Sequence, residues 1–324
     1  MVRVTRTGDA VKIVLHYRAS PGFRRIAAEM CPPDFQLSTI DETDDEQFSS
    51  ALRDVDVIFH VLRPLAARDI EAAPKLKLIQ KIGVGVNTID LQAAKGRGVA
   101  VCNMPGTNTQ AVAEMTLTLM LSALRRAVYF DGLTRAGEGW RPDVDQFDRL
   151  GEISGRTVGL IGYGAVPSRL APVLTALGAD VVYTARSQKP DAAGRFLPLD
   201  ELLQVSDIVS LHCPATDETR GMLSRDALQM MKKGAVLVNT ARGELVDEAA
   251  LTDLLSNGHL AAAGLDVFAR EPVNEDIPLF HLRNVVLAPH IAWLTPETLR
   301  RSMNVAMENC RRLQSGRELL HRVV

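Results

Sequence analysis

Residues 157–178 restrict the possible architecture more tightly than any other stretch of the chain. Residues 157–161 form a continuous apolar run, which is typical of a strand buried inside a parallel sheet. Gly162 and Gly164 follow directly, and residues 168–177 then carry apolar side chains at helical spacing. A strand, a glycine turn and a helix in this order predict a doubly wound α/β sheet whose turn lets the backbone approach a pyrophosphate.

The turn departs from the usual dinucleotide fingerprint at one position, because Pro167 stands where a third glycine is expected. Proline is tolerated in the first turn of a helix, but its ring prevents the close helix–strand contact that glycine allows. Pro172 lies further along and is expected to kink the helix. A glycine pair alone indicates a cofactor only weakly, so the downstream motifs must support this interpretation.

Apolar runs alternate with helical patterns along the whole chain. The strands expected in the first part are residues 11–16, 36–40, 55–61, 76–82 and 99–103. Those expected in the second part are residues 157–161, 180–184, 207–211, 235–239, 262–266 and 285–288. Helical patterns lie between them, such as residues 247–256, and residues 108–135 are expected to form one long helix that crosses into the second part. This alternation predicts two α/β domains, each with a doubly wound parallel sheet.

Composition fits an enzyme of ordinary globular type. The 324 residues are 46% hydrophobic and 23% charged with a net charge of −2, which is ample for two cored domains and gives no reason to expect nucleic acid. The four cysteines, Cys31, Cys102, Cys213 and Cys310, are far apart, so we expect neither a metal site nor a disulfide framework.

The amino terminus and the hydropathy pattern indicate in which cellular compartment the protein is expected. Residues 1–10 are polar and lack the apolar core of a signal peptide, and no stretch is long and apolar enough to span a membrane. A cytoplasmic protein with no membrane partner is therefore expected.

Three motifs in the second half place Arg242, Glu271 and His290 beside predicted strand ends. A guanidinium binds a carboxylate in a forked geometry that lysine cannot reproduce, and a histidine held against a carboxylate can move a proton near neutral pH. Each residue taken alone has an ordinary structural explanation. Arg242 could pair with a buried carboxylate, Glu271 could belong to a Glu-Pro pair that ends a segment, and His290 could be a capped loop residue. Together they predict reduction of a 2-keto acid, with the hydride supplied by a nicotinamide cofactor.

Further motifs lie along the chain at residues 81–90, 112–114, 209–214, 238–243 and 264–268. In these motifs, and over nearly its whole length, the chain resembles the D-isomer-specific 2-hydroxyacid dehydrogenase family. The resemblance implies a Rossmann-type dinucleotide-binding domain, residues 106–293, and a flavodoxin-like substrate (catalytic) domain made of residues 1–105 and 294–324. The helix that begins near Pro296 would return to the substrate domain, and the active site would lie in the cleft between the domains.

The mechanism that follows is a hypothesis about three side chains. Arg242 would bind the substrate carboxylate and stabilise negative charge that develops on the keto oxygen. Protonated His290 would deliver a proton to that oxygen, whereas a free histidine, titrating at about 6.5, is mostly neutral at pH 7. Glu271 would orient the ring and favour its charged form.

In the predicted substrate domain, Val84, Gly85 and Val86 follow a strand, and their backbone N–H groups are expected to bind the other side of the carboxylate. A plain strand-to-helix turn is an equally good interpretation of this segment. Arg63 is a further candidate cation for the substrate, although a surface role suits it as well.

The choice between NAD and NADP depends on the residues after the second strand of the cofactor domain. NAD-binding domains usually have an acidic side chain there for the ribose hydroxyls. This chain has Thr184, Arg186 and Ser187, followed by Lys189, which predicts a pocket for the 2′-phosphate and a preference for NADP over NAD.

The family motifs imply further cofactor contacts. In addition to the glycine turn with Ala165 and Val166, they are Val112, Cys213, Pro214, Thr219, Thr240, Ala241, Asp266 and Ala292. Trp293 follows Ala292 as it does in some glyoxylate/hydroxypyruvate reductases, and it is either an anchor in the core or a substrate contact. A small 2-keto acid such as glyoxylate or hydroxypyruvate is the expected substrate, giving the D-2-hydroxy acid, and pyruvate-like or bulkier acids are the alternatives.

Two further expectations come from the resemblance. Relatives usually form homodimers, with the predicted helix at residues 108–135 as a main element of the interface. Some proteins of this fold act instead as cofactor-sensing corepressors that bind peptides, and they can retain the whole catalytic set. Turnover on a keto acid distinguishes an enzyme from a binding protein of that kind.

Overall fold

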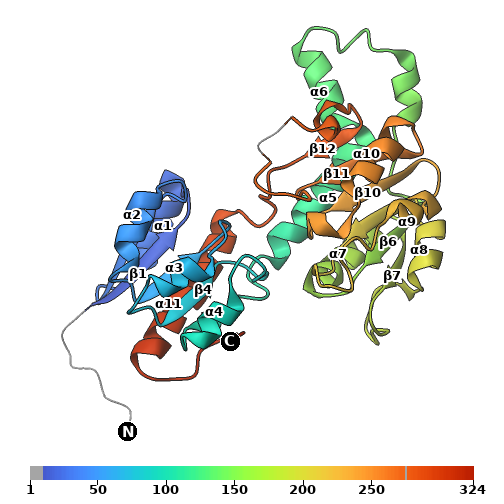
Figure 1. Cartoon of the computed structure of the whole chain (residues 1–324). Helices are drawn as coiled ribbons and strands as arrows, with labels where there is room; N and C mark the ends of the chain where they lie inside the picture. The colour runs from blue at the N-terminus through green and yellow to red at the C-terminus, as the bar shows by residue number, and fades with distance from the viewer. Residues whose placement is uncertain (1–9, 274–275) are drawn as a thin grey trace. The chain divides into compact units, whose positions relative to one another are not determined.

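The computed structural model describes residues 10–273 and 276–324 (Figure 1). It divides into two compact units, the first made of Met1–Asn108 and Leu294–Val324 and the second of Thr109–Trp293. The prediction made for the polar amino terminus lies outside the described residues, apart from residue 10.

The first unit is built on a 5-stranded parallel sheet with the strand order β2-β1-β3-β4-β5. Its strands are β1 (Val11–His16), β2 (Phe35–Ile40), β3 (Val57–His60), β4 (Leu78–Lys81) and β5 (Ala100–Cys102). Its helices are α1 (Pro21–Met30), α2 (Asp45–Leu52), α3 (Ala67–Glu71), α4 (Leu91–Gly96) and α11 (Pro296–Gln314).

The carboxy-terminal helix α11 is fixed to the first sheet by a buried amide. Asn309 on this helix donates from Nδ2 to Oε1 of Gln80 on β4 at 2.7 Å, and its Oδ1 accepts the N–H of Leu320 at 2.7 Å. Both Asn309 and Gln80 are fully buried, so the hydrogen bonds offset the cost of removing two amides from water. Residues from the two ends of the chain therefore share one core.

The second unit contains a 7-stranded parallel sheet with the strand order β12-β11-β10-β9-β6-β7-β8. Its strands are β6 (Thr157–Ile161), β7 (Asp180–Thr184), β8 (Arg195–Phe196), β9 (Ile208–Leu211), β10 (Ala235–Asn239), β11 (Leu260–Leu265) and β12 (Val285–Leu287). Its α-helices are α5 (Thr109–Arg125), α6 (Ala127–Arg135), α7 (Ala165–Ala176), α8 (Leu199–Val205), α9 (Arg225–Met230) and α10 (Glu248–Ser256), and 3-10 turns occupy Val144–Arg149, Gly243–Leu245 and Pro278–His281. Two parallel α/β sheets confirm the predicted fold class.

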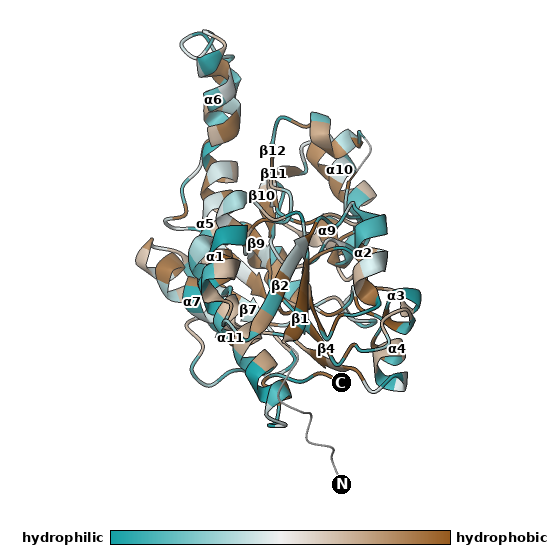
Figure 2. Cartoon of the chain, turned by 90° about the vertical axis from the view of Figure 1, so that its left-hand side faces the viewer, coloured by the Kyte–Doolittle hydropathy of each residue, from teal (hydrophilic) through white to brown (hydrophobic). Residues whose placement is uncertain are grey.

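The strands owe their positions to continuous apolar runs. Four consecutive side chains of β3 and all five of β10 are buried, as expected for strands covered on both faces. Figure 2 shows β1 and β4 coloured mainly as hydrophobic, whereas the edge strand β2, which has polar and exposed positions, is partly teal. At Gly264 on β11, a Cβ atom would lie 2.9 Å from Cβ of Leu119, so the missing side chain lets α5 approach the sheet closely.

The expected long helix over residues 108–135 was wrong, because the structure has two helices, α5 and α6, separated at Arg126. Arg126 adopts a left-handed backbone with φ of +49°, which ends the regular hydrogen-bonding of α5. Its side chain donates to Oε1 of Gln146 and, at 3.4 Å, to the carbonyl of Arg283, and it lies over the ring of Tyr129. These tertiary contacts stabilise the break.

The predicted glycine turn leads directly into α7, which continues through Pro172. Pro167 lies in the first turn of this helix and is buried, and the short edge strand β8 was not predicted. None of the helices in residues 10–273 and 276–324 combines the length and hydropathy needed to cross a bilayer.

Candidate active site

The parallel strands of the second sheet bring the predicted site residues to one edge. Neighbouring strands end in register, since Leu211 of β9 pairs with Asn239 of β10, which pairs with Leu265 of β11, which pairs with Leu287 of β12. Arg242 and His290 follow β10 and β12 directly, and Glu271 lies in the segment after β11. Ligands of doubly wound sheets bind at the carboxyl ends of the strands, so this edge is the candidate active site.

His290 and Glu271 form the closest contact of the site. Nδ1 of His290 lies 2.5 Å from Oε2 of Glu271, and the two side chains are 23% and 31% exposed. The other carboxylate oxygen, Oε1, accepts the backbone N–H of Phe268 at 2.9 Å. An ionised carboxylate only accepts hydrogen bonds, so Nδ1 carries the proton and Nε2 is the nitrogen able to exchange one with a substrate.

A buried aspartate holds the turn that carries His290. Asp266 is 1% exposed, and its two carboxylate oxygens accept the N–H groups of Ile291 and Ala292 at 2.8 and 2.9 Å. Its backbone carbonyl accepts the N–H of His290 at 2.7 Å. The indole of Trp293 donates to the carbonyl of His290 at 3.1 Å. These bonds keep His290 in a left-handed conformation with φ of +56°, which a side chain other than glycine adopts at a cost.

Arg242 lies in the turn after β10, and the side chain of Asn239 stabilises this turn with two hydrogen bonds. Oδ1 of Asn239 accepts the N–H of Ala241 at 3.0 Å, and its Nδ2 donates to the carbonyl of Arg242 at 2.9 Å. The next residue, Gly243, lies against the Phe268 backbone so closely that a Cβ would fall 1.9 Å from the Phe268 carbonyl carbon. Glycine at this position therefore lets the turn that carries Arg242 pack on the segment that leads to Glu271.

The pKa values of the three charged groups reflect this packing. Burial lowers the pKa of Arg242, partly offset by the charges of Glu244 and Glu271. Burial alone would raise the pKa of Glu271, but the hydrogen bond and charge of His290, the Phe268 N–H and Arg242 together lower it. Burial raises the pKa of Asp266 in spite of its two backbone donors. Glu271 is thus the carboxylate of this site that favours its ionised form.

The glycine turn has the geometry that a pyrophosphate needs. Gly162 has a φ of +95°, and a Cβ there would lie 2.8 Å from the carbonyl carbon and oxygen of His212. Gly164 is the N-cap of α7 and makes no side-chain cap, and a Cβ there would meet no atom within 4 Å. The first turn of α7 contains Ala165 and Val166, whose backbone N–H groups lie at the positive end of the helix. The turn therefore leaves open space in front of a helix terminus, where the phosphates of a dinucleotide fit.

The residues predicted to choose the cofactor follow β7, the neighbour of β6. Thr184 ends β7 and pairs with Ile161 of β6, next to the glycine turn. Arg186, Ser187 and Lys189 are exposed in the segment that follows. Cationic and hydroxyl side chains are thus grouped at the end of β7, where side chains bind the ribose of a dinucleotide in this fold.

The remaining predicted cofactor residues belong to the same unit. Cys213 and Pro214 follow β9, and the Thr219 hydroxyl donates to the carbonyl of Pro214 at 2.6 Å. The Thr240 hydroxyl lies 2.8 Å from that of Thr116, which joins α5 to the turn after β10. The others, placed on α5, after β10 and after β12, are Val112, Ala241 and Ala292.

The predicted substrate-binding residues of the first unit are in two places. Val84, Gly85 and Val86 lie between β4 and α4, and the carbonyl of Val84 accepts Nδ2 of Asn103 at 2.9 Å. Arg63 is already engaged inside its own unit, since it donates to the carbonyl of Glu42 and forms an ion pair with Asp45. The structure thus gives Arg63 a structural partner.

Several residues that shape the site were not predicted from the sequence. Asn239 makes two of the bonds that brace it, Thr116 makes one with Thr240, and Glu248 accepts the N–H of Ala269 at 2.9 Å. Of these three residues, only Glu248 has a recognisable sequence signal, because it is an acidic residue at the start of a predicted helix. The other bonds depend on which loops meet in three dimensions.

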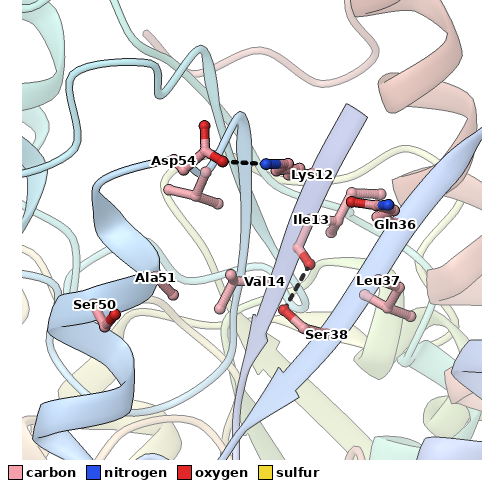
Figure 3. Close-up of a pocket in the computed structure, with 10 residues that line it drawn as sticks. Lys12, Ile13, Val14, Gln36, Leu37, Ser38, Ser50, Ala51 and Asp54 are labelled. Carbon is pink, nitrogen blue, oxygen red and sulfur yellow. Dashed lines mark hydrogen bonds and ion pairs between the residues drawn. The ribbon is translucent and has the colours of Figure 1, made fainter. Parts of the chain in front are cut away.

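A pocket of about 320 Å³ lies in the first unit between β1, β2 and α2 (Figure 3). It shares no residue with the site described above. Figure 3 shows the ion pair of Lys12 with Asp54 and the bond from Ser38 to the carbonyl of Ile13, at 3.3 Å. Among the described residues, no cluster of histidine, cysteine, aspartate and glutamate is arranged to hold a metal ion.

Comparison with known proteins gives consistent matches. A family model described as the D-isomer specific 2-hydroxyacid dehydrogenase, NAD binding domain, matches residues 117–292. The chain is 41% identical over 272 residues to a glyoxylate reductase of Aeropyrum pernix, covering 82% of this chain and 81% of the relative. It is 32% identical over 280 residues to a hydroxypyruvate reductase of Blautia hydrogenotrophica, covering 85% and 87%. The solved NADPH-dependent glyoxylate/hydroxypyruvate reductase of Sinorhizobium meliloti, in complex with NADP and malonate, superposes with a TM-score of 0.82 at 29% identity, covering 98% of this chain and 97% of that one.

Proposed function

Because the chain belongs to the D-isomer-specific 2-hydroxyacid dehydrogenase family, we propose that it reduces a small 2-keto acid, either hydroxypyruvate to the D-2-hydroxy acid or glyoxylate to the achiral glycolate. It is an NAD(P)-dependent oxidoreductase. The observation that carries the proposal is the 2.5 Å contact between His290 and Glu271 on the sheet edge that also holds Arg242.

His290 is the proton donor for the keto oxygen in this proposal. Glu271 fixes the ring through Nδ1, so Nε2 faces the reacting group, and the negative charge of the carboxylate favours the protonated imidazole. In the reverse direction, neutral His290 accepts the hydroxyl proton at the same nitrogen. Asp266 and Trp293 keep the ring in place through the backbone of the turn.

Arg242 binds the substrate carboxylate and stabilises charge on the keto oxygen. Burial strengthens this interaction, because a partly buried guanidinium is less screened than one in water. The forked arrangement of its donors sets the plane of the substrate, which orients the keto carbon. When bound, a nicotinamide cofactor supplies the hydride that no side chain can deliver. The glycine turn and the first turn of α7 are the residues that would hold its pyrophosphate.

We propose that the cofactor is NADP in preference to NAD. The support is the group Arg186, Ser187 and Lys189 after β7, which suits a phosphate dianion, together with the absence of an acidic residue at Thr184 or in residues 185–189. A carboxylate at that place would repel the 2′-phosphate.

For the first unit we propose the role of substrate domain. The loop that contains Val84, Gly85 and Val86 would contribute backbone N–H groups to the substrate carboxylate. The ion pair of Arg63 with Asp45 makes Arg63 a weaker candidate for this role, and the loop carries the proposal. The second unit would be the dinucleotide-binding domain.

Self-association is also part of the proposal, with a second copy of the chain as the partner. Helix α6 has no buried residue and extends away from the rest of its unit (Figure 1). Trp140, in the segment after it, is 92% exposed, and Val128 and Val144 are exposed as well. Apolar side chains gathered on a projecting arm fit a dimer interface. Sedimentation of the wild type and of the Trp140→Ser variant tests this interface. We expect the wild type to be a dimer and the variant to dissociate more readily. A variant that stays as dimeric as the wild type would contradict the proposed interface.

The experiment that tests the function is a panel of 2-keto acids assayed with NADPH and with NADH. We expect turnover on glyoxylate and hydroxypyruvate with a higher kcat/KM for NADPH. Micromolar binding of the cofactor with no turnover on any keto acid would instead favour the corepressor-like alternative. Turnover with a strong NADH preference would leave the reductase function standing and refute the cofactor preference.

A further inference from the structure

The segment between β7 and β8, residues 185–194, has exposed side chains and no regular secondary structure up to β8. It contains Arg186, Ser187 and Lys189, which must meet a single phosphate in the proposed cofactor pocket. If a loop becomes ordered only when the ligand binds, the entropy lost in ordering the loop lowers the affinity for the ligand. What holds this loop in the absence of ligand therefore bears on cofactor choice.

Two tyrosine hydroxyls hold the loop from the protein interior. The hydroxyl of Tyr183, on β7, accepts the N–H of Lys189 at 2.8 Å and donates to the carbonyl of the same residue at 3.3 Å. The hydroxyl of Tyr163, between the two glycines of the phosphate turn, accepts the N–H of Ala193 at 2.8 Å. The loop is thus tied at two points of its backbone.

The two tyrosines are fixed by packing on each other. Their ring centroids are 4.4 Å apart, and the ring of Phe196 lies 5.6 Å from that of Tyr183. Tyr183 is 1% exposed, and burial raises the pKa of Tyr163, so the Tyr163 hydroxyl stays protonated near neutral pH. The aromatic cluster joins the glycine turn to the loop that carries the cationic side chains.

We propose that Tyr163 and Tyr183 are positioning residues for cofactor selection. By fixing the backbone at Lys189 and Ala193, they order the loop so that Arg186 and Ser187 face the 2′-phosphate. This inference rests on the proposed preference for NADP. NADH lacks the 2′-phosphate and gains nothing from the order of these side chains, so the tyrosines act on one cofactor and not on the other.

The test uses Tyr163→Phe and Tyr183→Phe, each of which keeps the ring and removes only the hydroxyl. We expect kcat/KM for NADPH to fall roughly 2- to 10-fold in each variant, the effect of losing one or two hydrogen bonds, while kcat/KM for NADH changes by less than about 2-fold. The NADH assay is the internal control, because general damage to the cofactor domain would lower both values.

A double-substitution cycle sharpens the test. If the hydroxyls act through the loop, Tyr183→Phe should cost much less NADPH efficiency in an Arg186→Ala background than in the wild-type chain. Equal losses for the two cofactors, or an unchanged NADPH to NADH ratio in both tyrosine variants of an NADPH-preferring wild type, would overturn the inference. A wild type that prefers NADH would refute the cofactor proposal itself and the inference with it. Should Tyr183→Phe fail to fold, the half-buried Tyr163 still decides the question.

Discussion

Nδ1 of His290 lies 2.5 Å from Oε2 of Glu271, although 19 residues separate the two in sequence. The contact forms because β11 and β12 are parallel neighbours, so the segments that follow them leave the sheet at the same edge. Asp266, at the end of β11, then binds the backbone of the His290 turn and sets the direction of the ring. The strand order thus assembles an acid–base pair from separate loops.

Replacing Arg242 by lysine should remove the forked contact with the substrate carboxylate while keeping the positive charge. We expect kcat/KM to fall roughly 100-fold or more, since a fixed donor to developing charge is worth about that much. The matched control is Arg270→Lys, an exposed arginine beside Glu271, which should leave the rate within about 2-fold. Similar small losses in both variants would show that Arg242 does not bind the substrate.

Gly243→Ala tests the packing of the two catalytic segments. The added Cβ would overlap the Phe268 carbonyl, so the turn must shift, and we expect a loss of activity together with a loss of stability of about 2 kcal/mol or more. Gly96→Ala serves as control, because that glycine lies in α4 with open space around its Cβ position, where alanine favours the helix. Thermal unfolding and kcat are measured for both. Wild-type values for Gly243→Ala would contradict the packing described.

Asp266→Asn should loosen the turn that carries His290. An amide nitrogen cannot accept an N–H, so either Ile291 or Ala292 loses its partner, which costs about 1–3 kcal/mol. We expect kcat to fall more than the affinity for NADP, measured by fluorescence titration. Asp253→Asn, at an exposed ion pair with Arg225, is the control. A change in cofactor affinity alone would assign Asp266 to cofactor binding instead.

Two buried histidines, His16 and His60, and the half-buried His212 should make the fold sensitive to acid. Burial lowers the pKa of His16 to about 4 and that of His212 to about 3, and it lowers the pKa of His60 well below its ordinary value. The unfolded chain binds these protons from about pH 6.5 downward and the folded chain does not, so stability is full above that pH and declines as the pH falls towards the folded values.

For His212 the loss is at most about 1.4 kcal/mol per pH unit below 6.5. Urea unfolding of the intact chain between pH 8 and pH 5 measures it. His212→Gln removes the titration and can still bond to the hydroxyl of Ser210, which lies 2.9 Å from Nε2 in the wild type. Its stability should therefore depend less on pH. An identical dependence in the two proteins would rule out this contribution.

The fold could be predicted where local pattern and tertiary environment agree. Residues 157–161, 180–184 and 235–239 are apolar runs bounded by turn residues, and they match β6, β7 and β10 without adjustment. The break at Arg126 could not be predicted, because the helical pattern continues through it and the left-handed conformation depends on contacts with Gln146 and Arg283.

The residues of the site also fall into those that the sequence predicts and those that it does not. Arg242, Glu271 and His290 could be named because their chemistry is visible in short motifs at strand ends. The bonds of Trp293 and Asn239 could not, because they join a side chain to a backbone group whose direction is set by the turn itself. The bonds of Tyr183 to Lys189 and of Tyr163 to Ala193 could not be predicted either, because they depend on the pairing of β6 with β7 and on the path of the loop that follows.

The pH dependence of kcat/KM for glyoxylate reduction, compared between the wild type and Glu271→Gln, tests the acid–base pair most directly. Reduction needs the protonated imidazole, so activity falls as pH rises. Glu271→Gln removes the negative charge that faces Nδ1 of His290, so we predict that the pH profile of the variant changes shape, with the fall at lower pH than in the wild type. If the two profiles coincide and differ only in height, Glu271 does not control the protonation of His290 and the proposed mechanism is wrong.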